Sequence, residues 1–289
     1  IIIVSGANLL ATDTLIGGSG TDALHITNFA TANAAVLDLS GIESIVIKDG
    51  VANADMTLTL TFTDANTVAL TIDASELDAG EDFTLVATDA EVDGALTVTG
   101  GGGADVLTTG DGADIITGGG GPDTITGDVG ADIIKWLATA GAAMATESGA
   151  ATGDTDFSAG VAGDKVVGFA TGSDKFHFAA AAVTSAAGVE TDTLLTIGAA
   201  GTVTNVARFV EITASFDGTT GDAIADLAAL NTTAVLSGDS FIVFMHDGTN
   251  GYLYLVEEAG NTHIQASEVT LIGQVTGVTD VANGDFVSF

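Results

Sequence analysis

Aspartate recurs at every ninth position in the middle of the chain, at Asp105, Asp114, Asp123 and Asp132. Each lies in a unit of the form Gly-Gly-x-Gly-x-Asp-x-U-x, where U is a large aliphatic residue, and four such units fill residues 100–135. Glycine permits backbone conformations that turn carbonyl oxygens toward a common point, and the aspartate adds an anionic oxygen. Because such a loop offers only oxygen ligands, the pattern predicts sites for several Ca²⁺ ions.

The repeat spacing predicts which loops meet. Two units make one coil of a solenoid, so loops two units apart stack on the same side. We therefore expect Asp105 to share an ion with Asp123, and Asp114 to share one with Asp132. The other loop residues expected to contribute to these sites are Gly100, Gly102, Thr109, Asp111, Gly119, Gly121, Asp128 and Gly130.

Two further aspartates extend the predicted calcium sites upstream. A fifth unit at residues 17–25 carries Asp22, although no partner two units further on is evident. Asp93, next to Gly94, falls at a loop position if the register is extended back from the repeats.

Two other interpretations of the glycine-rich units do not fit their sequence. A flexible linker would show no fixed spacing. A phosphate-binding loop would need a Gly-Lys-Ser/Thr sequence between a strand and a helix, which the repeats lack.

Threonine alternates with apolar residues before the repeats. Residues 56–63 have a period of two, and residues 68–72, 83–85 and 96–98 follow the same rule. This alternation predicts strands with one buried face and one threonine-covered face. Val98 lies nine positions before Leu107, so the strand stack is expected to run directly into the repeats.

The region after the repeats has a different pattern. Residues 137–163 are expected to form a loop or short helix, residues 163–178 to contain strands, and residues 222–230 to form a helix. Residues 241–246 and 252–257 flank a turn and predict a β-hairpin.

The sequence thus predicts an all-β parallel β-solenoid, a calcium β-roll continuous with threonine-rich strands and capped by a C-terminal β-rich segment. The expected domains are 1–99, 100–135 and 136–289.

Composition excludes several classes of function. The chain has 289 residues, with 39 acidic and 5 basic side chains, and its net charge is −34. A nucleic-acid binder needs a basic face, and we expect no basic patch on this protein. The absence of cysteine excludes disulfides and cysteine-ligated zinc. With 46% hydrophobic residues the chain is too apolar for acidic disorder.

No sequence feature indicates membrane insertion or catalysis. No apolar run approaches the roughly 20 residues that a spanning helix requires. The start at Ile1, without a Met or a basic leader, favours a cut within a longer polypeptide or a processed end, and is not a Sec signal peptide. The four histidines are scattered and no HExxH motif occurs. We expect a protein that is not an enzyme.

The tandem units resemble the RTX family of proteins, which Gram-negative bacteria secrete through type I exporters. Residues 164–176 are similar to the segment that follows the repeats in that family, and the predicted hairpin and last residues resemble its uncleaved export signal. Residues 38–47 and 94–101, with the excess of Thr and Ala and the scarcity of Lys, resemble RTX surface-layer proteins.

This resemblance implies a structural function. The chain would be the C-terminal portion of a calcium-binding surface-layer protein, secreted to the cell surface of a Gram-negative bacterium, where it assembles with copies of itself into a lattice or filament. Its other partners would be the type I exporter and, through parts outside this sequence, lipopolysaccharide. Two alternatives remain: the C-terminal RTX module of an adhesin, or the export tail of a secreted hydrolase.

Overall fold

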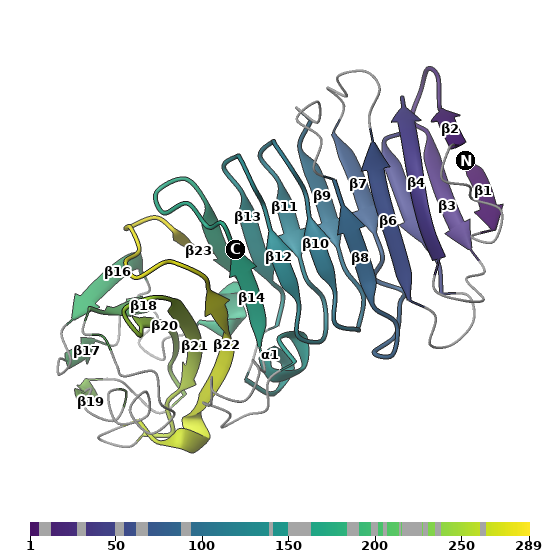
Figure 1. The fold of residues 1–289 in the computed structure, drawn as a ribbon. Coiled ribbons are helices and arrows are strands. Elements are labelled where there is room, and N and C mark those ends of the chain that lie inside the picture. Colours follow the sequence, from purple (N-terminus) through teal and green to yellow (C-terminus); the bar gives the residue numbers. More distant parts are fainter. Residues whose placement is uncertain are drawn as a thin grey trace. The chain divides into compact units, whose positions relative to one another are not determined.

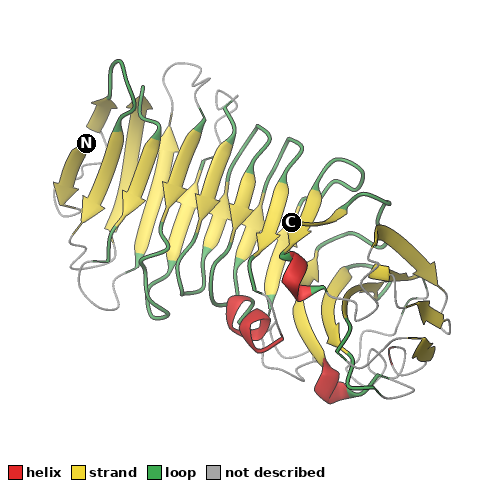
Figure 2. Cartoon of the chain, turned by 180° about the vertical axis from the view of Figure 1, so that it is seen from behind, coloured by secondary structure: helices red, strands yellow, loops and turns green. Residues whose placement is uncertain are grey.

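The structure is a computed structural model, and it forms two compact units. The solenoid unit is Ile1–Ile134 and the C-terminal unit is Lys135–Phe289. The described residues are 1–5, 13–27, 33–49, 55–61, 69–87, 94–138, 141–149, 163–183, 191–197, 202–204, 207–213, 215, 227, 231–234, 238–260 and 264–289. Strands make up most of the described secondary structure (Figure 2).

The solenoid unit consists of two parallel sheets that receive strands alternately (Figure 1). One sheet contains β1 (Ile2–Ser5), β3 (Ala23–Thr27), β5 (Ser44–Ile47), β7 (Leu70–Asp73), β9 (Leu96–Thr99) and β11 (Ile115–Thr117). The other contains β2 (Asp13–Ile16), β4 (Asn33–Ser40), β6 (Met56–Thr61), β8 (Phe83–Val86), β10 (Val106–Thr108) and β12 (Thr124–Thr126). β13 (Ile133–Trp136) begins at the end of this unit.

Columns of aliphatic side chains hold the coils in register. Because side chains alternate between the two faces of a strand, one residue in two points between the sheets. The buried side chains in the first sheet pair in the order Leu24, Ile45, Ile72, Val98 and Ile116. Those in the second sheet pair in the order Leu58, Leu85, Leu107 and Ile125. The threonine-rich strands therefore continue into the glycine-rich repeats, as the sequence predicts.

The C-terminal unit mixes parallel and antiparallel strands. Neighbours follow the order β16 (Thr191–Ile197), β18 (Ala207–Ile212), β20 (Ser240–His246), β21 (Gly251–Glu257), β22 (Val269–Val275) and β14 (Asp164–Val167). The predicted hairpin is confirmed, since β20 and β21 pair antiparallel. β15 (Lys175–Phe178) follows β13 in its sheet and pairs in parallel with β23 (Phe286–Ser288). β17 (Thr202–Thr204) and β19 (Asn231–Ala234) form a separate two-stranded parallel sheet.

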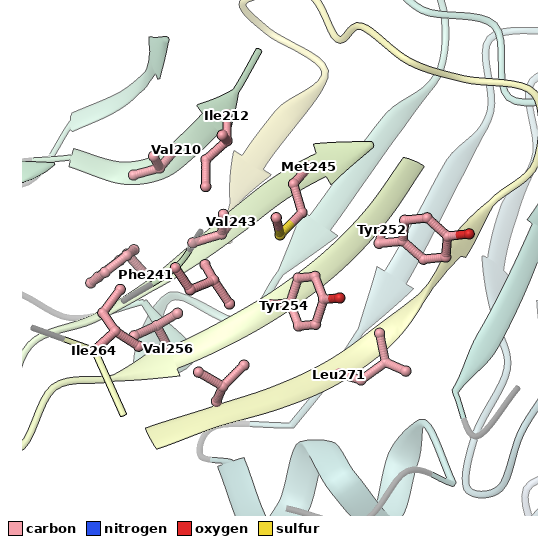
Figure 3. Packing of buried hydrophobic residues seen from close by; sticks show 12 residues of the cluster. Val210, Ile212, Phe241, Val243, Met245, Tyr252, Tyr254, Val256, Ile264 and Leu271 are labelled. Carbon is pink, nitrogen blue, oxygen red and sulfur yellow. The ribbon is translucent and has the colours of Figure 1, made fainter. Parts of the chain in front are cut away.

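Two groups of buried apolar side chains stabilise the C-terminal unit. Figure 3 shows the first, on β18, β20, β21 and β22, where Val243, Tyr254 and Leu271 are among the fully buried members. The second is aromatic: the Trp136 ring stacks on Phe178, with ring centroids 5.1 Å apart, and Phe169 stacks on Phe176 at 4.0 Å. These rings bury enough apolar area to organise this part of the chain.

Short helices complete the C-terminal unit. They are α1 (Gly141–Glu147) and the 3₁₀ turns η2 (Ala180–Ala182) and η3 (Ala266–Glu268). α1 lies in the segment expected to hold a loop or short helix. Of the predicted helix 222–230, only Leu227 lies within the described residues, and it is helical. Among the described residues, no helix has both the length and the apolar character needed to cross a bilayer.

Candidate calcium sites

The glycine-rich loops of the repeats lie in two rows. Residues 100–105 and 118–123 lead from the first sheet to the second, and residues 109–114 and 127–132 lead back. Each row therefore brings together loops that are two units apart in the sequence. This is the stacking that the nine-residue spacing predicts.

Backbone hydrogen bonds join the aspartates of each row into a column. The Asp105 N–H donates to Asp123 Oδ1 at 2.8 Å, and the Asp114 N–H donates to Asp132 Oδ1 at 2.9 Å. The Phe83 N–H makes the same bond to Asp105 Oδ1 at 2.8 Å. The structure thus brings together both predicted pairs of aspartates and aligns their carboxylates along the solenoid axis.

These carboxylates are buried, which disfavours their charged form. Asp105 and Asp114 are 1% and 0% exposed, and burial raises the pKa of each to about 6. For Asp105, N–H donors from Phe83 and Gly101 offset part of this rise in pKa, and the charge of Asp82 adds to it. A bound divalent cation would reverse this balance, because it favours the ionised carboxylate.

Asp114 has a buried carboxylate oxygen that could bind a cation. Its Oδ1 accepts the Leu96 N–H at 2.7 Å, whereas its buried Oδ2 has no hydrogen-bond partner among the described residues. The Thr109 hydroxyl lies near enough to lower the pKa of Asp114, but its geometry directs it to the Gly127 carbonyl at 3.4 Å. A buried carboxylate oxygen without a donor is costly unless a cation binds it.

Glycine is required where the stacked loops approach each other. Gly119 has a φ of +112°, and a Cβ there would lie 2.1 Å from the Gly101 carbonyl oxygen. At Gly121, with a φ of +99°, a Cβ would lie 2.1 Å from the Gly103 carbonyl oxygen. Any side chain at these positions would push the two loops apart. Asp128 replaces a consensus glycine and keeps the left-handed conformation, with a φ of +63°.

The donor set fits calcium if backbone carbonyls take part. Within the described residues, no three carboxylate or histidine side chains are grouped so that they alone could hold an ion. Calcium takes 6–8 oxygen ligands, so carbonyl oxygens from the glycine-rich loops would have to complete each shell. The residues that would hold the ions are Asp105 with Asp123 in one row and Asp114 with Asp132 in the other.

The other residues predicted within the tandem repeats occupy the same loops. Gly100, Gly102, Thr109, Asp111, Gly119, Gly121, Asp128 and Gly130 all lie in the two rows. Thr109 is fully buried, whereas Asp128 is exposed. Asp93 lies outside the described residues.

The isolated unit at residues 17–25 does have a stacked partner, which sequence reasoning missed. The Asp22 N–H donates to Glu43 Oε2 at 2.6 Å, so Glu43 takes the place that the next aspartate takes in the repeats. Leu24 pairs with Ile45 in the adjoining strands. The signal was present, because Gly41-Ile-Glu43-Ser-Ile45 matches positions four to eight of the unit with Glu in place of Asp. The half-buried Asp22 also has an Oδ2 without a partner in the described structure.

Asp82 is a second residue at these loops that the nine-residue pattern does not predict. Its Oδ1 accepts the Ala104 N–H at 2.8 Å, so it lies against the first repeat loop. It precedes Leu85 by three positions, whereas Asp105 precedes Leu107 by two, and this displacement hid it from a fixed nine-residue pattern. The exposed Asp82 carboxylate adds negative charge at the upstream end of this row.

Comparison with known proteins agrees with this geometry. A family model described as the RTX calcium-binding nonapeptide repeat, with four copies, matches residues 98–134. Neither curated proteins nor solved structures give a significant match to the chain. The matched segment contains all four stacked aspartates of the two rows. The chain therefore carries RTX repeats, whose ion is Ca²⁺, and these repeats indicate a secreted, extracellular calcium-binding protein.

Proposed function

We propose that this chain is a structural, non-enzymatic component of a bacterial surface layer, which is exported unfolded, folds when it binds calcium and assembles with copies of itself. The observation that carries the proposal is the pair of buried aspartate columns on stacked glycine-rich loops. These columns lie inside a solenoid whose core is a continuous aliphatic stack. Such a scaffold is rigid only when cations neutralise its columns.

The excess of Thr and Ala and the scarcity of Lys support the surface-layer assignment. The resemblance to proteins that Gram-negative bacteria export by type I secretion supports it as well. The net charge of −34 makes divalent cations the natural means of association, because copies of the chain repel each other at long range. Monovalent salt screens exposed charges but cannot bridge two carboxylates.

The test compares three solutions of the purified protein by light scattering and negative-stain imaging. Millimolar calcium should produce ordered arrays, EDTA should dissolve them, and NaCl at the same or higher ionic strength with EDTA should not replace calcium. Arrays in NaCl with EDTA would contradict calcium-dependent assembly. A folded protein that stays monomeric in calcium would instead favour the adhesin module, and a catalytic motif upstream in the full-length gene would favour the hydrolase tail.

A further inference from the structure

The few basic residues of this acidic chain are not evenly distributed. The chain has 5 of them, and three meet in the C-terminal unit around β23 and the residue after it. The Lys135 Nζ lies 4.3 Å from the centroid of the Phe289 ring, and the Lys175 Nζ donates to the Gly284 carbonyl at 2.9 Å. Arg208 Nη1 donates to Ser288 Oγ. Strand pairing thus gathers basic residues that are far apart in the sequence.

The two lysines point to the same outer face. The rings of Trp136, Phe176 and Phe178 are buried against one another, with centroids 5.1 and 6.0 Å apart for the pairs that include Trp136. Because side chains alternate along a strand, the neighbours Lys135 and Lys175 face the opposite side. His177 shares that outer face, and all three side chains are half-buried. We call these three residues the cationic face.

No carboxylate in the described structure neutralises the two lysines. Their contacts are with an aromatic ring and a carbonyl, whereas Lys48 forms an ion pair with Glu76 elsewhere in the described structure. The environment of His177 reflects this positive charge: burial lowers its pKa, and Lys135 and Lys175 lower it further. The cationic face thus keeps positive charge that is free to attract an anionic partner, in a chain with 39 acidic residues.

We propose that the cationic face binds carboxylates on a second copy of this chain, and so forms one contact of the assembly on which the proposed function rests. Charge complementarity favours this partner. Each copy exposes acidic side chains, among them Asp55, Asp78 and Asp82 on the turns of its solenoid unit. Two molecules of charge −34 repel each other in most orientations. The lysines of the cationic face would attract an acidic surface of a second copy, so this orientation is favoured.

The experiment compares two double variants with the same net charge. Lys135→Gln/Lys175→Gln removes the two lysines of the cationic face, and Lys48→Gln/Lys165→Gln removes two others. Each pair lowers the charge from −34 by two. In calcium, sedimentation velocity should show that the first variant needs about tenfold more protein to associate than the wild type, while the second behaves like the wild type. Lys135→Arg/Lys175→Arg should restore association, since it keeps the charge.

Each other outcome overturns the proposal in an identifiable way. Equal association by the two Gln double variants would show that the cationic face is not a contact, while leaving calcium-dependent assembly in place. A wild-type protein that stays monomeric in calcium would overturn both the contact and the proposed function. Normal assembly of the first variant with loss of binding to anionic lipid vesicles would identify a lipid partner instead. Fluorescence of Trp136, the only tryptophan, verifies that each variant folds.

Discussion

At the scale of single residues, the stacked aspartates differ in how completely they are surrounded. Asp123 is 1% exposed and belongs to the tandem array, while Asp22 is half-buried and pairs with a glutamate. We expect Asp123→Asn to weaken calcium binding by more than tenfold, because the amide keeps an oxygen for the Asp105 N–H but loses the charge. Asp22→Asn should have a smaller effect. Calorimetric calcium titrations of the two variants check this, and equal losses would show that the tandem array is not special.

The raised pKa values of Asp105 and Asp114 predict opposite pH dependence with and without calcium. In the calcium-free fold these pKa values are about 6, against 3.8 for an exposed aspartate, so between these values the folded state binds more protons than the unfolded state. Raising the pH through this window therefore destabilises the calcium-free protein. With calcium bound the carboxylates must be ionised, so stability should rise with pH.

Melting temperatures in EDTA and in calcium, at about pH 5 and about pH 7.5, measure this effect. In EDTA the melting temperature should be lower at the higher pH, and in calcium it should be higher. The double variant Asp105→Asn/Asp114→Asn should lose most of the difference in EDTA. A melting temperature in EDTA that rises between the two pH values would contradict the assignment of these two carboxylates.

At the scale of elements, two glycine positions allow the cost of backbone strain to be measured separately from the cost of a steric clash. Gly119 and Gly20 have similar φ values, +112° and +121°, but only at Gly119 would a Cβ meet a carbonyl of the preceding coil. Gly20→Ala should cost about 1–2 kcal/mol, the penalty of the left-handed conformation. Gly119→Ala should cost clearly more and should also reduce calcium affinity. Equal unfolding free energies for the two variants, by urea denaturation, would mean that the loops separate without cost.

How far the sequence predicts the fold depends on whether the signal is periodic. The strands around Leu58, Leu85 and Leu107 and the two aspartate rows follow from regular spacing, and the structure places them as expected. Glu43 and Asp82 escaped prediction because coils before the repeats have variable length, so their partners do not recur at a fixed distance. The strand order of the C-terminal unit also escaped it, since long-range pairing leaves no local pattern.

At the scale of the whole molecule, calcium should decide whether the chain is folded. If each site has a dissociation constant near ~10⁻⁴ M, about 1 mM calcium adds about 1.4 kcal/mol per site. Two to four sites then supply about 3–6 kcal/mol, a large share of the usual stability of a domain. Circular dichroism and Trp136 fluorescence should show a much less structured chain in EDTA at neutral pH. Full β-structure and unchanged melting in EDTA would overturn this prediction.

The alternation of strands between two sheets limits how the roll can change length. Residues 118–126 form one unit, and deleting them would send every later strand to the opposite sheet, with its loop in the wrong row. Deleting residues 109–126, which are two units, would shorten the roll by one coil and leave every remaining strand in its own sheet. We expect the longer deletion to fold with fewer bound ions, and the shorter one to lose calcium-dependent folding. Insertions and deletions in such a roll should therefore be tolerated only in even numbers of repeats. This restricts how the repeat region of the gene can change in length.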